Sequence, residues 1–121
     1  MVYKLQFEMN SSPYTLEDYI TAQGKKPFKE WLEGLKDVSG RARIRVRLAK
    51  VRLGNLGDHA SVGGGVEELR FRFSPGYRVY YAHEADHVIL LLYGGAKASQ
   101  KKDIAMAKEF WNDYKRRKKD A

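Results

Sequence analysis

The chain has 121 residues, a length that suits one compact domain with a core of its own. Apolar residues make up 43% and charged residues 31%, a balance that excludes a disordered or fibrous chain. There is no cysteine, which excludes disulfides, a thiolate nucleophile and a cysteine zinc site. No apolar run approaches a membrane span and residues 1–6 lack the features of a signal peptide, so we expect a cytoplasmic protein without a membrane partner.

The charge is positive and unevenly distributed. A net charge of +8 predicts a protein that meets a polyanion. Residues 41–57 hold six basic and no acidic side chains, and residues 97–121 hold nine basic against four acidic. The first of these segments is typical of an RNA or DNA footprint, of a docking surface for an acidic partner, or of solubilising charge, and the sequence leaves these alternatives open. Within it, Arg41 and Arg45 are candidates for RNA contact.

The N-terminal region mixes strand and helix signals. Residues 3–9 alternate as in a half-buried strand, and residues 10–13 read as a turn. Residues 14–20 are compatible with a strand or with the start of a short helix. A helix is expected from Pro27 to about Leu35, because proline suits the first turn and three large apolar residues follow at helical spacing: Phe28, Trp31 and Leu32.

The next helix, expected from about Ser39 to Leu53, has two apolar stripes. One stripe contains Ile44, Leu48 and Val51. The other lies on nearly the opposite side and consists of Ala42, Val46, Ala49 and Leu53. The pattern predicts a helix wedged between two apolar surfaces, one the sheet and the other the preceding helix or a partner protein.

Residues 54–66 are rich in glycine and predict a long loop. They lack both G-x-G-x-x-G and the Lys-Ser/Thr ending of a P-loop, which argues against a nucleotide cradle.

A hairpin follows, with strands over 68–73 and 77–82 and a three-residue turn at 74–76. The alternation predicts that the core face pairs Phe73 with Tyr77, Phe71 with Val79, and Leu69 with Tyr81. On the opposite face it places Arg72 beside Arg78, and Arg70 beside Tyr80.

The C-terminal third is expected to complete an α+β fold. Residues 88–93 are apolar on both faces, as in a central strand covered on both sides. Ser99 is a candidate cap for a last helix, and residues 115–121 read as a basic, frayed tail behind a single domain of residues 1–114. We therefore predict an antiparallel sheet of about four strands, with two N-terminal helices and one C-terminal helix.

The outward face of the hairpin is the best candidate site. Facing arginines repel one another, and with a tyrosine beside them they suit a phosphate-bearing ligand. The alternative is a solvated sheet face on which Arg70 or Arg72 is neutralised by Glu68 or a distant acid. Lys97 follows the buried strand and could bind an anion near the last helix. A metal site is not predicted, because His83 and His87 bracket a turn without an evident third ligand.

Several strings in the sequence resemble the RelE/ParE toxin superfamily, nearest to its HigB-like, phage-derived addiction module killer proteins. The resemblance covers about residues 15–114 and rests on the strings Phe28-Lys29-Glu30-Trp31-Leu32, Arg52-Leu53-Gly54-Asn55-Leu56-Gly57-Asp58, Glu68-Leu69-Arg70, Pro75-Gly76-Tyr77-Arg78-Val79-Tyr80-Tyr81, Leu91-Leu92-Tyr93-Gly94-Gly95-Ala96-Lys97 and Gln100-Lys101-Lys102-Asp103-Ile104.

The resemblance implies a small RelE-like fold and the toxin of a type II toxin–antitoxin module, often a ribosome-dependent endoribonuclease that cleaves mRNA without a metal or cofactor. Its expected partners are the ribosome, mRNA and a helix-turn-helix antitoxin, with DNA met only through the antitoxin complex. Arg78 would stabilise the scissile phosphate and Lys97 would assist. Tyr80, Tyr93 and Asp103 are the residues nearest to an acid or base. A gyrase inhibitor like ParE, or an inactive antitoxin-binding module, is the alternative.

Overall fold

The computed structural model describes residues 13–121, and it is an α+β fold built on a five-stranded mixed sheet. The chain runs through β1 (Thr15–Asp18), α2 (Pro27–Glu33), α3 (Val38–Arg52), β2 (His59–Gly63), β3 (Val66–Arg70), β4 (Tyr77–Ala85), β5 (Val88–Ala96), a 3-10 turn (Lys97–Ser99) and α4 (Gln100–Asp120). The strand order is β1-β5-β4-β3-β2. The predicted strand over 3–9 lies outside the described residues.

The sheet differs from the predicted antiparallel sheet of four strands at both edges. At one edge β1 runs parallel to β5, with Thr15 beside Val88, which resolves the ambiguity at residues 14–20 in favour of a strand. At the other edge the glycine-rich segment, expected to be a loop, forms β2 and pairs antiparallel with β3. Gly63, Gly64 and Gly65 make the turn between them, and all three have positive φ angles that favour glycine.

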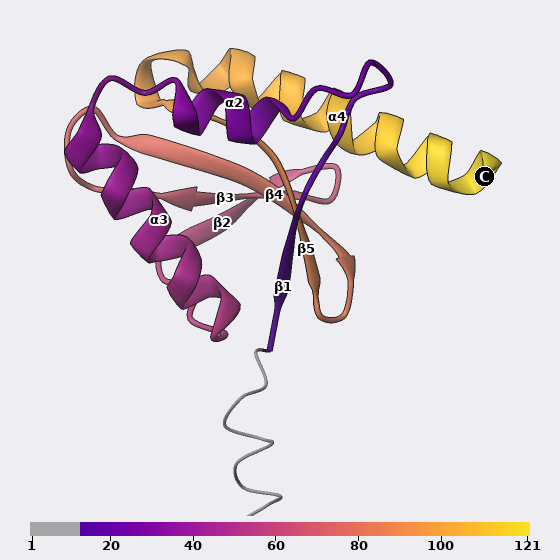
Figure 1. Ribbon diagram of the computed structural model, residues 1–121, viewed down its shortest axis with the longest axis horizontal. Coiled ribbons are helices and arrows are strands. Elements are labelled where there is room, and N and C mark those ends of the chain that lie inside the picture. Colours follow the sequence, from indigo (N-terminus) through magenta and orange to yellow (C-terminus); the bar gives the residue numbers. More distant parts are fainter. Residues whose placement is uncertain (1–12) are drawn as a thin grey trace, which may run out of the picture.

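Helices cover both faces of the sheet, with α2 and α3 on one side and α4 on the other (Figure 1). Both N-terminal helices match their predicted ranges to within two residues. α3 is held at its start by the carboxylate of Asp37, which accepts a hydrogen bond of 2.9 Å from the Gly40 backbone. β5 is buried on both faces, as its apolar sequence predicted.

Two hydrophobic clusters form the core, one on each face of the sheet. On the first face, Ile44, Leu48 and Val51 of α3 pack against Val79 and its neighbours. On the second face, Ala107 and Trp111 of α4 cover the other side of β4 and β5. Only one stripe of α3 is therefore covered: of the predicted second stripe, Val46 is 57% exposed and Leu53 is 68% exposed.

The C-terminal residues continue α4 to Asp120 instead of fraying after residue 114. Arg116 and Arg117 reach back to Asp113, at 3.2 Å and 2.9 Å, so ion pairs one helical turn apart support these last turns. No helix among residues 13–121 is long and apolar enough to cross a membrane.

Candidate functional site

Four predicted basic residues surround one hollow at the end of the sheet. This hollow, which we call the arginine pocket, has a volume of about 160 Å³ and is lined by Asp58, Arg70, Phe71, Arg72, Gly76, Arg78 and Lys97. The β3–β4 hairpin brings the arginines together, and the 3-10 turn directly after β5 contributes the lysine. The structure brings Arg70, Arg72, Arg78 and Lys97 together around this hollow, whereas Tyr80, expected to shape the same groove, is not part of its lining.

The hairpin register differs from the predicted one by two residues. Arg70, not Arg72, pairs directly with Arg78, and Tyr80 pairs with Glu68. The turn is longer than expected, because the last hairpin hydrogen bond joins the Phe71 nitrogen to the Tyr77 oxygen at 3.0 Å. A shift of two residues keeps every side chain on its predicted face, so the arginines still share one surface.

Arg78 is the most enclosed cation of the pocket, with its side chain only 11% exposed. Its Nη1 donates hydrogen bonds to the carbonyl oxygens of Gly76 at 2.9 Å and Tyr77 at 3.2 Å. Its Nε has no hydrogen-bond partner and lies 3.7 Å from Glu68 Oε1. The guanidinium is thus held in place while one donor stays unpaired.

Asp58 supplies a counter-charge to the other two arginines. Its carboxylate lies 3.4 Å from Arg70 Nε and 2.9 Å from Arg72 Nε. Neither Arg70 Nε nor Asp58 Oδ2 has a hydrogen-bond partner, so these contacts are ion pairs without hydrogen-bond alignment. The sequence left open that an acid neutralises Arg70 or Arg72, and Asp58 does so in part for both.

Glu68 is buried at 4% exposure and was not among the predicted site residues. It accepts a hydrogen bond of 2.9 Å from Gln100 Nε2 at the start of α4. Its oxygens lie 3.7 Å from Arg78 Nε and 4.0 Å from Arg70 Nε. Strand alternation places it on the same face as Arg70, which is the signal that identifies it from sequence.

Tyr80 lies beneath this face, fully buried by α4 and with no hydrogen-bond partner for its hydroxyl. Burial raises the pKa of Tyr80 well above its ordinary value, and the nearby carboxylates of Glu68 and Asp103 raise it further. The phenol therefore keeps its proton at neutral pH.

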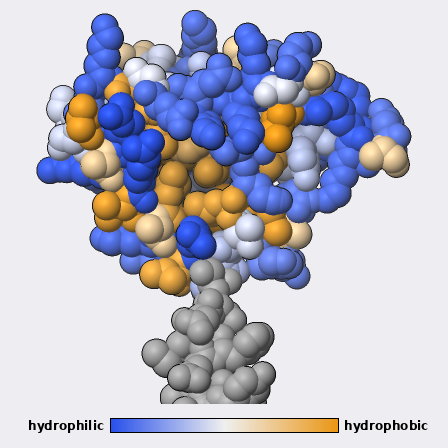
Figure 2. Space-filling view, viewed as in Figure 1, coloured by the Kyte–Doolittle hydropathy of each residue, from blue (hydrophilic) through white to orange (hydrophobic). Residues whose placement is uncertain are grey.

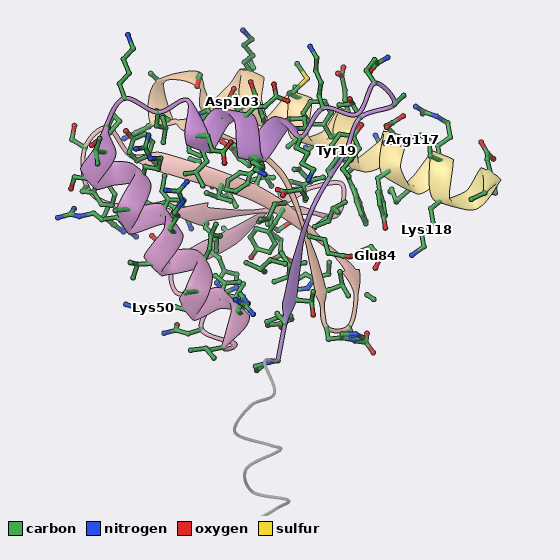
Figure 3. All side chains as sticks on the ribbon, viewed as in Figure 1. Tyr19, Lys50, Glu84, Asp103, Arg117 and Lys118 are labelled. Atoms are coloured by element: carbon green, nitrogen blue, oxygen red, sulfur yellow. The ribbon has the colours of Figure 1, made fainter. Side chains whose placement is uncertain are left out.

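Asp103 lies in the first turn of α4, where Figure 3 labels it, and is 5% exposed. The Ser99 hydroxyl donates a hydrogen bond to the Asp103 carboxylate. Ser99 therefore does not cap the helix backbone, and the predicted cap is wrong. Gly95 lies against it so closely that a Cβ there would come within 1.8 Å of Asp103 Oδ2. Glu68 and Asp103 are the two charged residues buried among residues 13–121, and the negative charge of each raises the pKa of Tyr80.

Three other predicted RNA contacts lie elsewhere. Tyr93 packs on Phe110, with ring centres 5.8 Å apart, and lines a separate hollow between α2 and α4. Arg41 donates a hydrogen bond of 2.7 Å to the Leu35 carbonyl, and Arg45 is exposed on α3. The structure does not bring these three into the arginine pocket.

The pocket is lined by groups that bind anions. Guanidinium groups bind phosphate through paired N–H donors, and Lys97 adds an exposed charge at the rim. Arg70 and Arg78 each keep a buried Nε without a hydrogen-bond partner, next to the carboxylates of Asp58 and Glu68. No cluster of three or more His, Asp or Glu side chains in the described part of the chain could hold a metal ion.

The fold and the pocket define a small α+β protein with a cationic hollow at the end of its sheet. No family model matches the chain. An uncharacterized protein of Haemophilus influenzae is 42% identical over 81 residues, which are 67% of this chain and 82% of that protein. The chain therefore belongs to the same family as this Haemophilus influenzae protein.

Proposed function

We propose that this protein is the toxin of a type II toxin–antitoxin module, with a RelE-like fold, and that it cleaves mRNA on the ribosome. The observation that carries the proposal is the arginine pocket, where three arginines and Lys97 line one hollow, with the buried Tyr80 two residues along β4 from Arg78. The resemblance of the motif strings to RelE-type toxins supports the same reading.

The proposed reaction is attack of an RNA 2′-hydroxyl on the adjacent phosphate, which needs charge stabilisation, a proton donor and a proton acceptor but no metal. Arg78, assisted by Arg70 and Lys97, would stabilise the pentacoordinate phosphate. Tyr80, whose phenol keeps its proton at neutral pH, would protonate the leaving 5′-oxygen. The proton acceptor would be one of the two buried carboxylates, Glu68 or Asp103.

The ribosome would supply the rest of the catalytic power. The pocket of about 160 Å³ is small, and single-stranded RNA has many conformations that do not align the 2′-hydroxyl with the phosphate. Holding the mRNA in a reactive geometry removes much of that entropic barrier. A toxin with modest acid–base equipment therefore depends on the ribosome for rate.

The outer side of α3 supports the expected antitoxin partner. On the face viewed in Figure 2, apolar side chains reach the surface along α3 amid hydrophilic ones. Val38 at 66% and Val46 at 57% exposure lie on a helix whose charged residues are all basic. An acidic antitoxin with apolar side chains would complement this surface, and DNA would be met through that complex.

The test is primer extension on a defined mRNA after brief induction of the protein. We expect cuts that require active translation and that disappear with Arg78→Ala. Arg116→Ala is the matched control, because it removes the same charge from an exposed position on α4 and should leave cleavage unchanged.

Two other outcomes would contradict the proposal. Intact mRNA in arrested, filamentous cells with DNA damage would favour the gyrase inhibitor. Intact mRNA with normal growth would leave an inactive, antitoxin-binding module.

A further inference from the structure

Arg47, in the middle of α3, is bonded to the backbone of two other segments. Its Nη2 donates hydrogen bonds of 2.9 Å to the carbonyl oxygens of Leu56 and Asp58, and its Nε contacts the Leu56 oxygen at 3.3 Å. Its Nη1 donates a hydrogen bond of 2.9 Å to the Arg70 carbonyl. One guanidinium therefore joins α3, the loop before β2, and the end of β3.

The surroundings of Arg47 are built for close contact. Its guanidinium carbon lies 4.9 Å from the centre of the Phe71 ring. Gly57 has a φ of +66°, and a Cβ there would come within 3.0 Å of Arg47 Nη2. Burial lowers the pKa of Arg47 from its ordinary value, and the negative charge of Asp58 acts in the opposite direction.

The loop that Arg47 holds carries the counter-charge of the arginine pocket. The Asp58 carbonyl also accepts a hydrogen bond of 2.9 Å from the Arg70 backbone nitrogen. The Asp58 side chain then lies 3.4 Å from Arg70 Nε and 2.9 Å from Arg72 Nε. The placement of both guanidinium groups thus depends on a loop that Arg47 anchors.

We propose that Arg47 is a positioning residue of the arginine pocket, which fixes Asp58 and through it aligns Arg70 and Arg72 for a phosphate group. This assignment rests on the proposed function for its catalytic consequence, but not for its effect on the geometry of the two arginines. The basic residues of α3 therefore fall into two groups. Arg47 bonds to the backbone around the arginine pocket, and its exposed neighbours on the helix do not.

Arg43 provides a matched control on the same helix. Its guanidinium carbon lies 4.5 Å from the Phe73 ring centre, much as Arg47 lies over Phe71. Arg43 makes no hydrogen bond to the Leu56–Asp58 loop within the described residues. The two residues share charge, helix and an aromatic neighbour but differ in the bonds that the proposal invokes.

The experiment compares the wild type with Arg47→Ala, Arg47→Lys and Arg43→Ala by NMR of the arginine Nε–Hε groups, with inorganic phosphate as the probe. In both Arg47 variants we expect the Arg70 and Arg72 signals to collapse toward those of free arginine. The Arg78 signal should persist, because that guanidinium is held by Gly76 and Tyr77. Lysine retains the charge, but its compact ammonium lacks the planar fork with which Arg47 spans the Leu56, Asp58 and Arg70 carbonyls, so it should not rescue the geometry.

Cleavage gives the second readout. Misplacement of about 1 Å can cost up to about 100-fold in rate, so kcat for mRNA cleavage should fall by that order in Arg47→Lys while Arg43→Ala matches the wild type. Unchanged Arg70 and Arg72 signals in a folded Arg47 variant would overturn the proposal, whether or not the protein cleaves RNA. The wild type could instead fail to cleave mRNA while the Arg70 and Arg72 signals still collapse in the Arg47 variants. That result would uphold the positioning role and reject the nuclease.

Discussion

Two clusters of arginine, tyrosine and carboxylate groups lie at opposite ends of α4, and they differ in how their polar atoms are satisfied. Beside the C-terminal half, Tyr19 donates a hydrogen bond of 2.5 Å to Asp113, which also accepts one of 2.9 Å from Arg117 Nε (Figure 3). Arg117 further bonds the Ile20 carbonyl. At the other end, by contrast, two arginines of the arginine pocket and the buried Tyr80 keep polar atoms without a hydrogen-bond partner.

The difference separates a structural cluster from one shaped for a ligand. The Tyr19 cluster ties the end of α4 to the segment after β1, and its hydrogen bonds are made within the protein. The arginine pocket and the Tyr80 hydroxyl leave comparable buried groups without a hydrogen bond, which is costly in free energy. The same residue types therefore serve stability at one end of the helix and, in our proposal, chemistry at the other.

The largest expected effect comes from removing the unpaired hydroxyl. Tyr80→Phe should lower single-turnover cleavage of mRNA by about 10² to 10⁴-fold, the usual contribution of a general acid. Its melting temperature should stay the same or rise, because the buried hydroxyl has no hydrogen bond to lose. The cleavage assay measures the first effect, and thermal unfolding measures the melting temperature. A Tyr80→Phe variant that cleaves normally would remove Tyr80 from the mechanism.

The same substitution in the other cluster should act in the opposite way. Tyr19→Phe deletes the hydrogen bond to Asp113 and should lower the free energy of unfolding by about 1 to 2 kcal/mol. Cleavage by the folded variant should match the wild type, since Asp113, the partner of Tyr19, lies ten residues along α4 from Asp103. Urea denaturation measures the first quantity. A stable Tyr19→Phe with impaired cleavage would mean that the two clusters are not separate in function.

The smallest effect is a pH dependence of stability. The pKa of Asp113 lies below its ordinary value of 3.8, mainly because Tyr19 donates a hydrogen bond to it. The hydrogen bond and positive charge of Arg117 lower this pKa as well. A lowered folded-state pKa stabilises the protein above the unfolded value and loses that contribution as pH falls through the folded one. The difference in unfolding free energy between wild type and Asp113→Asn should therefore be constant above about pH 5 and shrink toward about pH 3. A difference independent of pH would show that the Asp113 charge does not matter.

Helices and faces could be predicted from the sequence because their signals are local. The spacing of Phe28, Leu32, Ile44 and Leu48 defines α2 and α3, and strand alternation places Arg70, Arg78 and Tyr80 on one face. The hairpin register escaped prediction, because a two-residue shift leaves that alternation unchanged and only the length of the turn distinguishes the two pairings.

Features that depend on long-range packing could not be read from local patterns. β2 (His59–Gly63) was not predicted, because this segment is short, consists mostly of small residues and is flanked by glycines. It forms a strand by pairing with β3. The burial of Tyr80 requires α4 to cover the sheet, and Asp58 reaches the pocket from a loop that Arg47 anchors. None of these placements has a periodic signal in the sequence.

The most direct test uses ribosomes programmed with an mRNA that carries a single 2′-deoxy nucleotide at the position cut by the purified protein. Our account predicts cleavage of the unmodified mRNA, no cleavage at the 2′-deoxy position, and no cleavage of either by Arg78→Ala. Cleavage that survives loss of the 2′-hydroxyl, or unmodified mRNA left intact on translating ribosomes, would contradict it.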